Sequence, residues 1–213
     1  NSGNFKEAFN YSKKLEKHNL DTYESHLVSG IFYLKNSNID RAKKFFYKAN
    51  NKNPSLVLNN YVSKSLYNWS NLTNFNQGEQ DLKKINARFK NLKKIQNAFL
   101  NCYFNNPNTN QLFTEILSNQ STDFSRYNYF HASYFASIGK IQDAKKIINS
   151  ALKFYPRNLL INQYKIDLDK DKNILQFSCR KAEHVIAEIL YITANALSSQ
   201  SIYSLSNFYL NLA

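Results

Sequence analysis

The chain has 213 residues, 43% of them hydrophobic, with 16 Phe, 15 Tyr and a formal net charge of +13. This composition supplies a sizeable core and excludes a disordered chain, while only four Gly and three Pro argue against a β-sandwich or a Rossmann-type fold. The sequence contains no run of about 18 apolar residues that would predict a transmembrane helix, and it does not open with a charged-then-apolar signal. Because the first residue is Asn1 rather than Met, we expect a soluble, all-α piece of a longer or processed protein.

The first predicted element is a helix within residues 3–22. Its small and apolar positions precede a similar set by 34 residues: Gly3, Ala8 and Leu15 come before Ser37, Ala42 and Ala49. This helix matches only the second half of the repeat, so we expect the first helix of the same hairpin to lie upstream.

Residues 23–56 predict two helices joined by a tight turn. Asn38 or Asp40 can cap the second helix, because their short side chains accept hydrogen bonds from its free N–H groups. Pro54 is expected to end that helix. One apolar stripe of the first helix holds Leu27, Ile31 and Leu34.

Small residues in this segment predict a close approach of two helices. Gly30 and Ala42 are expected where the two axes come together, and Tyr33 and Phe46 are expected to fill the space beside them. The arrangement is an αα-hairpin.

This segment resembles a known helical repeat. Gly30, Tyr33, Ala42, Phe46, Ala49 and Pro54 match the signature of the tetratricopeptide repeat, a helix-turn-helix of 34 residues. The match departs from the family at His26, where Trp is usual, and at Ser29, where Leu is usual.

The middle of the chain fits the repeat less well. Residues 55–69 are predicted as a first helix, although Lys64 stands where a small residue is expected, and residues 70–78 as a loop. The apolar residues from Glu79 to Phe104 recur in steps of three and four, which predicts one long amphipathic helix. Residues 88–107, which overlap this helix, resemble a second helix of the repeat that ends at Pro107.

The later segments repeat the better pattern. Ala144 and Pro156 have the same separation as Ala42 and Pro54, and residues 169–173 form a polar break. In residues 125–158 the matching positions are Ala132, Phe135, Gly139, Ala144, Ile148, Ala151 and Pro156. At the C-terminus they are Ala194, Leu197, Tyr203 and Ala213, with Ser206 in place of the usual Ala.

The resemblance implies a right-handed superhelical α-solenoid that occupies residues 1–213 as one domain. The better repeats span residues 3–22, 23–56, 125–158 and 187–213, and irregular ones span 57–124 and 159–186. In such a solenoid the first helices line a concave face. Carried over position by position, that face holds Leu27, Ile31, Leu34, Tyr61, Ser65, Asn68, Tyr129, Ser133, Tyr191 and Asn195.

We therefore expect a non-catalytic scaffold that binds another protein, as an extended peptide or a helix, on this face. Tyr61, Tyr129 and Tyr191 share one motif position, where they either contact the partner or fill gaps between hairpins. Some members of the family hold a peptide's C-terminal carboxylate with Lys and Asn. The corresponding positions are apolar in this chain, so that activity is not expected.

A second hypothesis is a partner with negative charge. The solvent side of the long predicted helix would carry Lys83, Lys84, Arg88, Lys90, Lys93 and Lys94. Such a face could bind nucleic acid or an acidic membrane surface. We favour a solvated face instead, because Lys, Asn, Ile, Phe and Tyr all have AT-rich codons and the excess fits a bacterial genome of that composition.

No motif predicts chemistry. The four His are scattered, and no zinc-protease, hydrolase, phosphate-loop or calcium-loop pattern is present. Cys102 is expected to be buried, while Cys179 is either free or paired. We expect no enzyme activity, cofactor, metal or small-molecule substrate, and the location is left open between bacterial cytoplasm and periplasm.

Overall fold

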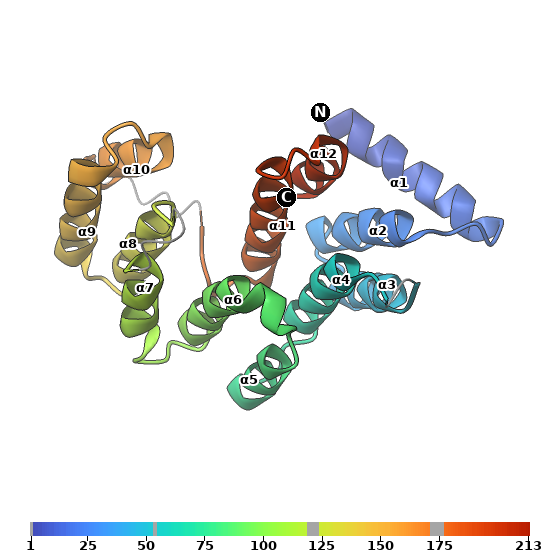
Figure 1. Cartoon of the computed structure of the whole chain (residues 1–213), viewed down its shortest axis with the longest axis horizontal. Helices are drawn as coiled ribbons and strands as arrows, with labels where there is room; N and C mark the ends of the chain where they lie inside the picture. The colour runs from blue at the N-terminus through green and yellow to red at the C-terminus, as the bar shows by residue number, and fades with distance from the viewer. Residues whose placement is uncertain (1, 53–54, 119–123, 171–176) are drawn as a thin grey trace. The chain divides into compact units, whose positions relative to one another are not determined.

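The computed structural model describes residues 2–52, 55–118, 124–170 and 177–213. Within these ranges the chain forms twelve α-helices, one short 3-10 helix and no strand, which confirms the all-α prediction (Figure 1). The chain divides into two compact units. Unit 1 contains residues 1–86 and 182–213, and unit 2 contains residues 87–181.

Unit 1 is assembled from both ends of the sequence. Its helices are α1 (Ser2–Lys17), α2 (Tyr23–Lys35), α3 (Ile39–Lys52), α4 (Val57–Ser70), α5 (Phe75–Lys83), α11 (Ala182–Ser198) and α12 (Tyr203–Leu212). Helices α1 to α4 each pack on the next, and α11 packs on both α4 and α12 (Figure 1). In a linear solenoid only neighbouring repeats touch. The α4–α11 contact departs from that pattern.

A buried pair of tyrosines also joins the two ends of the sequence within unit 1. The hydroxyl of Tyr23 on α2 donates to the carbonyl of Asn59 on α4 (3.3 Å) and lies 3.2 Å from the hydroxyl of Tyr209 on α12. Burial raises the pKa of the Tyr23 phenol above its ordinary value and that of Tyr209 to about 12. Both rings therefore stay neutral and hold three helices together.

Unit 2 is one continuous stretch of chain. It contains η1 (Ala87–Phe89), α6 (Lys90–Tyr103), α7 (Thr109–Leu117), α8 (Tyr127–Ser137), α9 (Ile141–Phe154) and α10 (Leu159–Asp169). Each of these α-helices packs on the next, and α10 also reaches α8. An aromatic cluster fills the space between them: Phe99, Phe113, Tyr127, Phe130 and Phe177. Cys102 and Cys179 form a disulfide beside it.

Helices α2 and α3 form within the segment where two helices joined by a tight turn were expected. A capping box at Thr22 and Ser25 starts α2, where each residue's backbone N–H donates to the other's side-chain oxygen. The N–H of Arg41 donates to Oδ1 of Asn38 (3.2 Å), so Asn38 is the residue that caps α3, and Asp40 lies inside the helix. Pro54, expected to end α3, lies outside the described residues.

Gly30 is required by direct contact with an aromatic ring. A Cβ atom at this position would overlap the side chain of Phe46 on α3, with Cδ1 only 2.6 Å away. Phe46 and Ala42 are both fully buried, so the two helices meet along this line. Phe46, which was expected to fill the space beside Gly30 and Ala42, lies directly against the glycine.

The same close approach recurs in two other hairpins. Residues twelve positions apart, one on each helix, are small and buried in each case. The pairs are Gly30 with Ala42, Ala132 with Ala144, and Ala194 with Ser206. In the last pair the Ser206 hydroxyl donates to the Ala194 carbonyl (2.8 Å), which explains how a hydroxyl is accommodated at this position.

Two predictions for the middle of the chain are wrong. Residues 75–78, expected in a loop, form the first turn of α5, because Oδ1 of Asn74 caps it by accepting from the Gln77 N–H (2.9 Å). Residues 79–104 do not form one helix. The N–H groups of Lys84 and Ile85 bond to carbonyls three residues earlier, at Asp81 and Leu82, which tightens and ends α5. The polar break expected at 169–173 begins where α10 ends, and residues 171–173 lie outside the described ranges.

Candidate functional site

Most residues predicted to line a concave groove are part of the helix packing. The buried members, each with less than a tenth of its surface exposed, are Leu27, Ile31, Tyr61, Ser65, Tyr129 and Ser133. Leu34, Asn68 and Tyr191 are half-buried, and Asn195 is exposed. Tyr129 and Ser133 lie in unit 2 and the others in unit 1, so each group is considered within its own unit.

The contacts of these residues show what the buried ones do. The Tyr129 ring packs edge-on against Tyr164 of α10, with centroids 4.8 Å apart. The Ser133 hydroxyl donates to the Phe177 carbonyl (3.2 Å). Tyr61 is 4% exposed and borders a small cavity of about 160 Å³. For Tyr61 and Tyr129 the burial favours the alternative in which the tyrosines fill gaps between helices.

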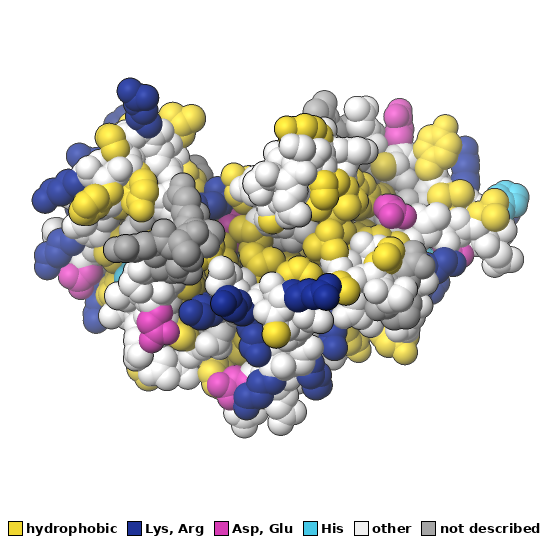
Figure 2. All heavy atoms as spheres, viewed as in Figure 1, with side chains coloured by type: hydrophobic (Ala, Val, Ile, Leu, Met, Phe, Trp, Pro, Cys, Tyr) yellow, Lys and Arg dark blue, Asp and Glu magenta, His cyan; other side chains and the backbone are white. Residues whose placement is uncertain are grey.

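Two of the predicted groove residues do border an open pocket. Ile31 and Leu34, at the end of α2, line a cavity of about 560 Å³ within unit 1. Its other apolar walls come from α1, α11 and α12: Phe5, Ile186, Ala187 and Leu212. Polar residues complete the lining: Lys35, Ser37, Glu183 and Asn211, with Ala213 beside them. Hydrophobic side chains are visible at the surface around α2 and α12 in Figure 2.

The apolar lining has a covered part and an accessible part. Ile31, Ile186 and Leu212 are each at most 8% exposed, so they support the pocket from behind. Phe5 and Leu34 are half-buried, which leaves apolar surface for a ligand. Apolar surface of this kind favours contact with another apolar group over contact with water.

Two exposed charges of opposite sign border the pocket. The ammonium of Lys35 lies over the Phe5 ring, 6.0 Å from its centroid. Glu183 stands in the first turn of α11, where a carboxylate suits the helix N-terminus. Among the residues the structure describes, Glu183 makes no ion pair. Its carboxylate is therefore available to a cationic group of a ligand.

The predicted basic face is divided between the two units. Lys83 ends α5 and Lys84 caps it in unit 1, whereas Arg88 in η1 and three lysines of α6 (Lys90, Lys93 and Lys94) belong to unit 2. Lys84 also pairs with Asp81 at 3.0 Å. Figure 2 shows Lys and Arg side chains over α5, over α6 and over α9. Because α5 and α6 are separate helices, the six residues do not share one helix face.

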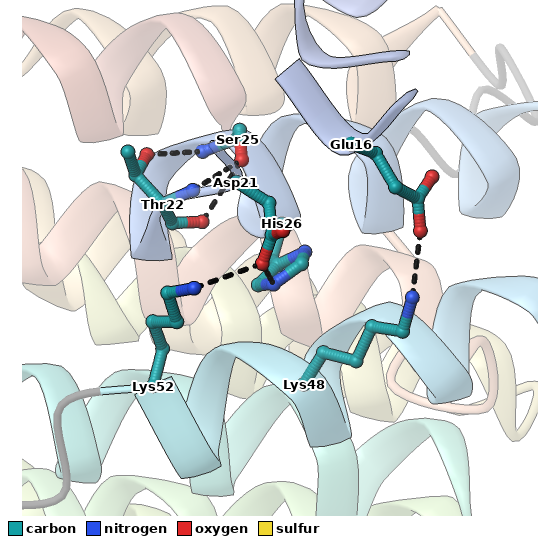
Figure 3. A network of polar contacts seen from close by, with 7 residues as sticks. All are labelled: Glu16, Asp21, Thr22, Ser25, His26, Lys48 and Lys52. Atoms are coloured by element: carbon teal, nitrogen blue, oxygen red, sulfur yellow. Dashed lines mark hydrogen bonds and ion pairs between the residues drawn. The ribbon is translucent and has the colours of Figure 1, made fainter. Parts of the chain in front are cut away.

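A polar network braces the turn between α1 and α2 against α3 (Figure 3). Oδ2 of Asp21 accepts from Nε2 of His26 (2.9 Å) and from Nζ of Lys52 (3.0 Å). The Lys52 hydrogen bond lowers the pKa of the Asp21 carboxyl, while burial lowers the pKa of His26. A separate ion pair joins Glu16 to Lys48 at 2.6 Å. Each of these charged groups already has a partner within the chain, so we assign the contacts to the stability of the fold and not to ligand binding.

Both cysteines and His131 are also engaged. Cys179 is bonded to Cys102, so neither sulfur is a free thiol. Nε2 of His131 lies 2.8 Å from Oδ1 of Asn110, and burial lowers the pKa of this imidazole to about 4. Among the described residues, no three His, Cys, Asp or Glu side chains are grouped so that they could hold a metal ion.

Comparison of the chain with protein-family models, with curated proteins and with solved structures finds no match. In the part of the chain that the structure describes, every helix is too short or too polar to cross a membrane.

Proposed function

We propose that this chain is a non-catalytic protein-interaction module built from tetratricopeptide-like hairpins. The proposal is supported by the three small-residue pairs, which have the same twelve-residue separation. It is also supported by the match of residues 23–56 to the repeat signature. The α4–α11 contact would make unit 1 an irregular member of that class, closed on itself instead of extended.

The working surface in this proposal is the pocket bordered by α1, α2, α11 and α12. The single observation that carries it is accessible apolar surface on Phe5 and Leu34 next to the carboxylate of Glu183, which no described residue neutralises. A volume of about 560 Å³ lies within the usual range for a ligand pocket, roughly 300–1,000 Å³.

The occupant we propose is a short apolar peptide segment of a partner protein that also carries a Lys or Arg. Its apolar side chains would cover Leu34 and Phe5, and its basic side chain would pair with Glu183. A small-molecule substrate is less suitable, because the polar residues that border the pocket are exposed to solvent. Apolar burial would supply most of the affinity, and the charge pair would set the orientation.

A phage-displayed library of random short peptides, selected on the immobilised chain, tests the proposal with a defined probe. We expect enrichment of apolar peptides that contain a basic residue. Their affinity, measured by fluorescence anisotropy, should fall at least tenfold in Leu34→Asp, which corresponds to about 1.4 kcal/mol. The matched control is Leu20→Asp, a change at a leucine that is 64% exposed and lies outside the pocket.

Two further measurements separate the alternatives. Glu183→Lys alters an exposed side chain and should shift the selection from basic towards acidic peptides, at a stability cost of about 1 kcal/mol for a cation at the N-terminus of α11. Binding to the parent should change little with salt. Peptides that bind only through acidic residues, with affinity falling steeply as salt rises and unaffected by Leu34→Asp, would refute the pocket and favour the basic residues of α6.

A further inference from the structure

The disulfide of unit 2 joins two buried positions that lie far apart in the sequence. Cys102 is in the last turn of α6 and Cys179 lies in the non-helical segment 177–181 that precedes α11. The two residues are separated by 77 positions, and their Cα atoms are 5.8 Å apart, within the range that a disulfide spans. Cys102 is 1% exposed and Cys179 is 5% exposed.

Side-chain contacts help to hold the segment that contains Cys179. The Phe177 ring packs on Phe130, with centroids 4.5 Å apart, and Nη2 of Arg180 donates to Oδ1 of Asn105 (3.1 Å). One backbone hydrogen bond lies within the segment, from the N–H of Lys181 to the carbonyl of Ser178. Because the chain has only two cysteines, this disulfide is the one covalent cross-link between the segment and α6.

The disulfide also closes most of unit 2 into one covalent loop of chain. Helices α7, α8, α9 and α10 all lie between the two cysteines in the sequence. A bond that closes so long a stretch of chain removes many conformations from the unfolded state, and this favours the folded one. Unit 2 begins at residue 87 and ends at residue 181, so the bond fastens its last segment to its first α-helix.

We propose that unit 2 is a redox-dependent fold and that the chain acts in an oxidising compartment outside the reducing cytosol. Disulfides persist in such compartments and are rare where thiols are kept reduced. Forming the bond removes one proton and one electron from each of the two thiols. A small-molecule disulfide such as oxidised glutathione takes up the two electrons and two protons and becomes two thiols, through a mixed disulfide.

Thiol trapping on the natural chain tests the proposal without any variant. Cells that make the protein are lysed in an alkylating reagent, and the chain is mapped by mass spectrometry before and after reduction. We expect no alkylation of Cys102 or Cys179 before reduction, a linked peptide containing both, and full alkylation of both after reduction. Alkylation of both thiols at lysis would overturn the proposal.

A stability measurement gives an independent test on the chain of residues 1–213. Reduction by dithiothreitol should move the urea midpoint of unit 2 downwards. The reduced parent should then coincide with the double variant Cys102→Ser/Cys179→Ser, which should not respond to dithiothreitol. Equal midpoints for the oxidised and reduced parent would show that the bond does not support the fold.

Discussion

Gly30→Ala should destabilise unit 1, although alanine is the better helix former. The new methyl group would overlap Cε1 of Phe46 and lie 2.6 Å from its Cδ1, whereas carbon atoms normally approach to about 3.5–4.0 Å. The ring must therefore move by at least about 1 Å, and it has no exposed surface into which to move. Overpacking of this kind costs about 1–3 kcal/mol, and replacing glycine in a helix returns about 1 kcal/mol. We therefore expect a net loss of up to about 2 kcal/mol in the free energy of unfolding.

The single tryptophan makes this measurement specific for unit 1. Trp69 lies on α4 and is 4% exposed, so its fluorescence changes when unit 1 opens. Urea unfolding followed by this signal gives the free energy for the parent and for Gly30→Ala. The double variant Gly30→Ala/Phe46→Leu should lose less than the sum of the two single changes, because the smaller leucine makes room for the methyl group. A gain in stability for Gly30→Ala, or strict additivity in the double variant, would refute the proposed contact.

Three other predictions follow from the buried polar groups and the disulfide. Burial keeps His131 neutral in the folded chain down to about pH 4, whereas the unfolded chain binds a proton near the ordinary pKa of 6.5. The stability contributed by the neutral imidazole is therefore complete above pH 6.5 and is lost as the pH falls towards about 4. Between about pH 7 and pH 4, the free energy of unfolding should fall by about 3 kcal/mol more in the parent than in His131→Phe, measured by urea unfolding and circular dichroism; equal losses would contradict the buried imidazole. Reducing the Cys102–Cys179 bond should lower the free energy of unfolding by about 4.5 kcal/mol through loop-closure entropy, measured the same way with and without dithiothreitol. Ser206→Ala should cost under about 1 kcal/mol, and Ser206→Leu should cost at least about 2 kcal/mol by Trp69 fluorescence, since only a small side chain fits against Ala194; equal effects would contradict the close approach of α11 and α12.

Local signals in the sequence predicted the regular hairpins well. Both helices expected within residues 23–56 are present as α2 and α3, because an apolar stripe and a following turn residue both act within a few positions. The small-residue positions were also predictable, since each pair lies on two helices joined by a short turn. Asn38 as a cap follows from the same local chemistry.

The long predicted helix shows where local patterns mislead. Apolar residues keep helical spacing through Leu82 and Ile85, and both are buried, yet α5 ends between them. The pattern reports which side chains face the core and does not report whether the backbone is continuous. A break of a few polar residues can leave the apolar spacing intact, so the basic face expected on one helix falls on two.

The candidate pocket was only partly predictable for a different reason. Ile31 and Leu34 were identified from their helix, but Glu183, Ile186 and Leu212 come from the other end of the sequence. Their meeting depends on the packing of α11 against α4 and of α12 against α11. The assumption that repeats contact only their neighbours directed attention to Tyr61 and other residues that proved to be buried.

Hydrogen–deuterium exchange, with and without the tightest peptide selected from the displayed library, tests whether the pocket of unit 1 is the binding surface. We expect slower exchange on binding at the end of α2 (residues 34–37), in the first turns of α11 and in the last turn of α12, with little change in unit 2. Protection confined to α6, or no protection around the pocket, would contradict the assignment of this pocket as the working surface.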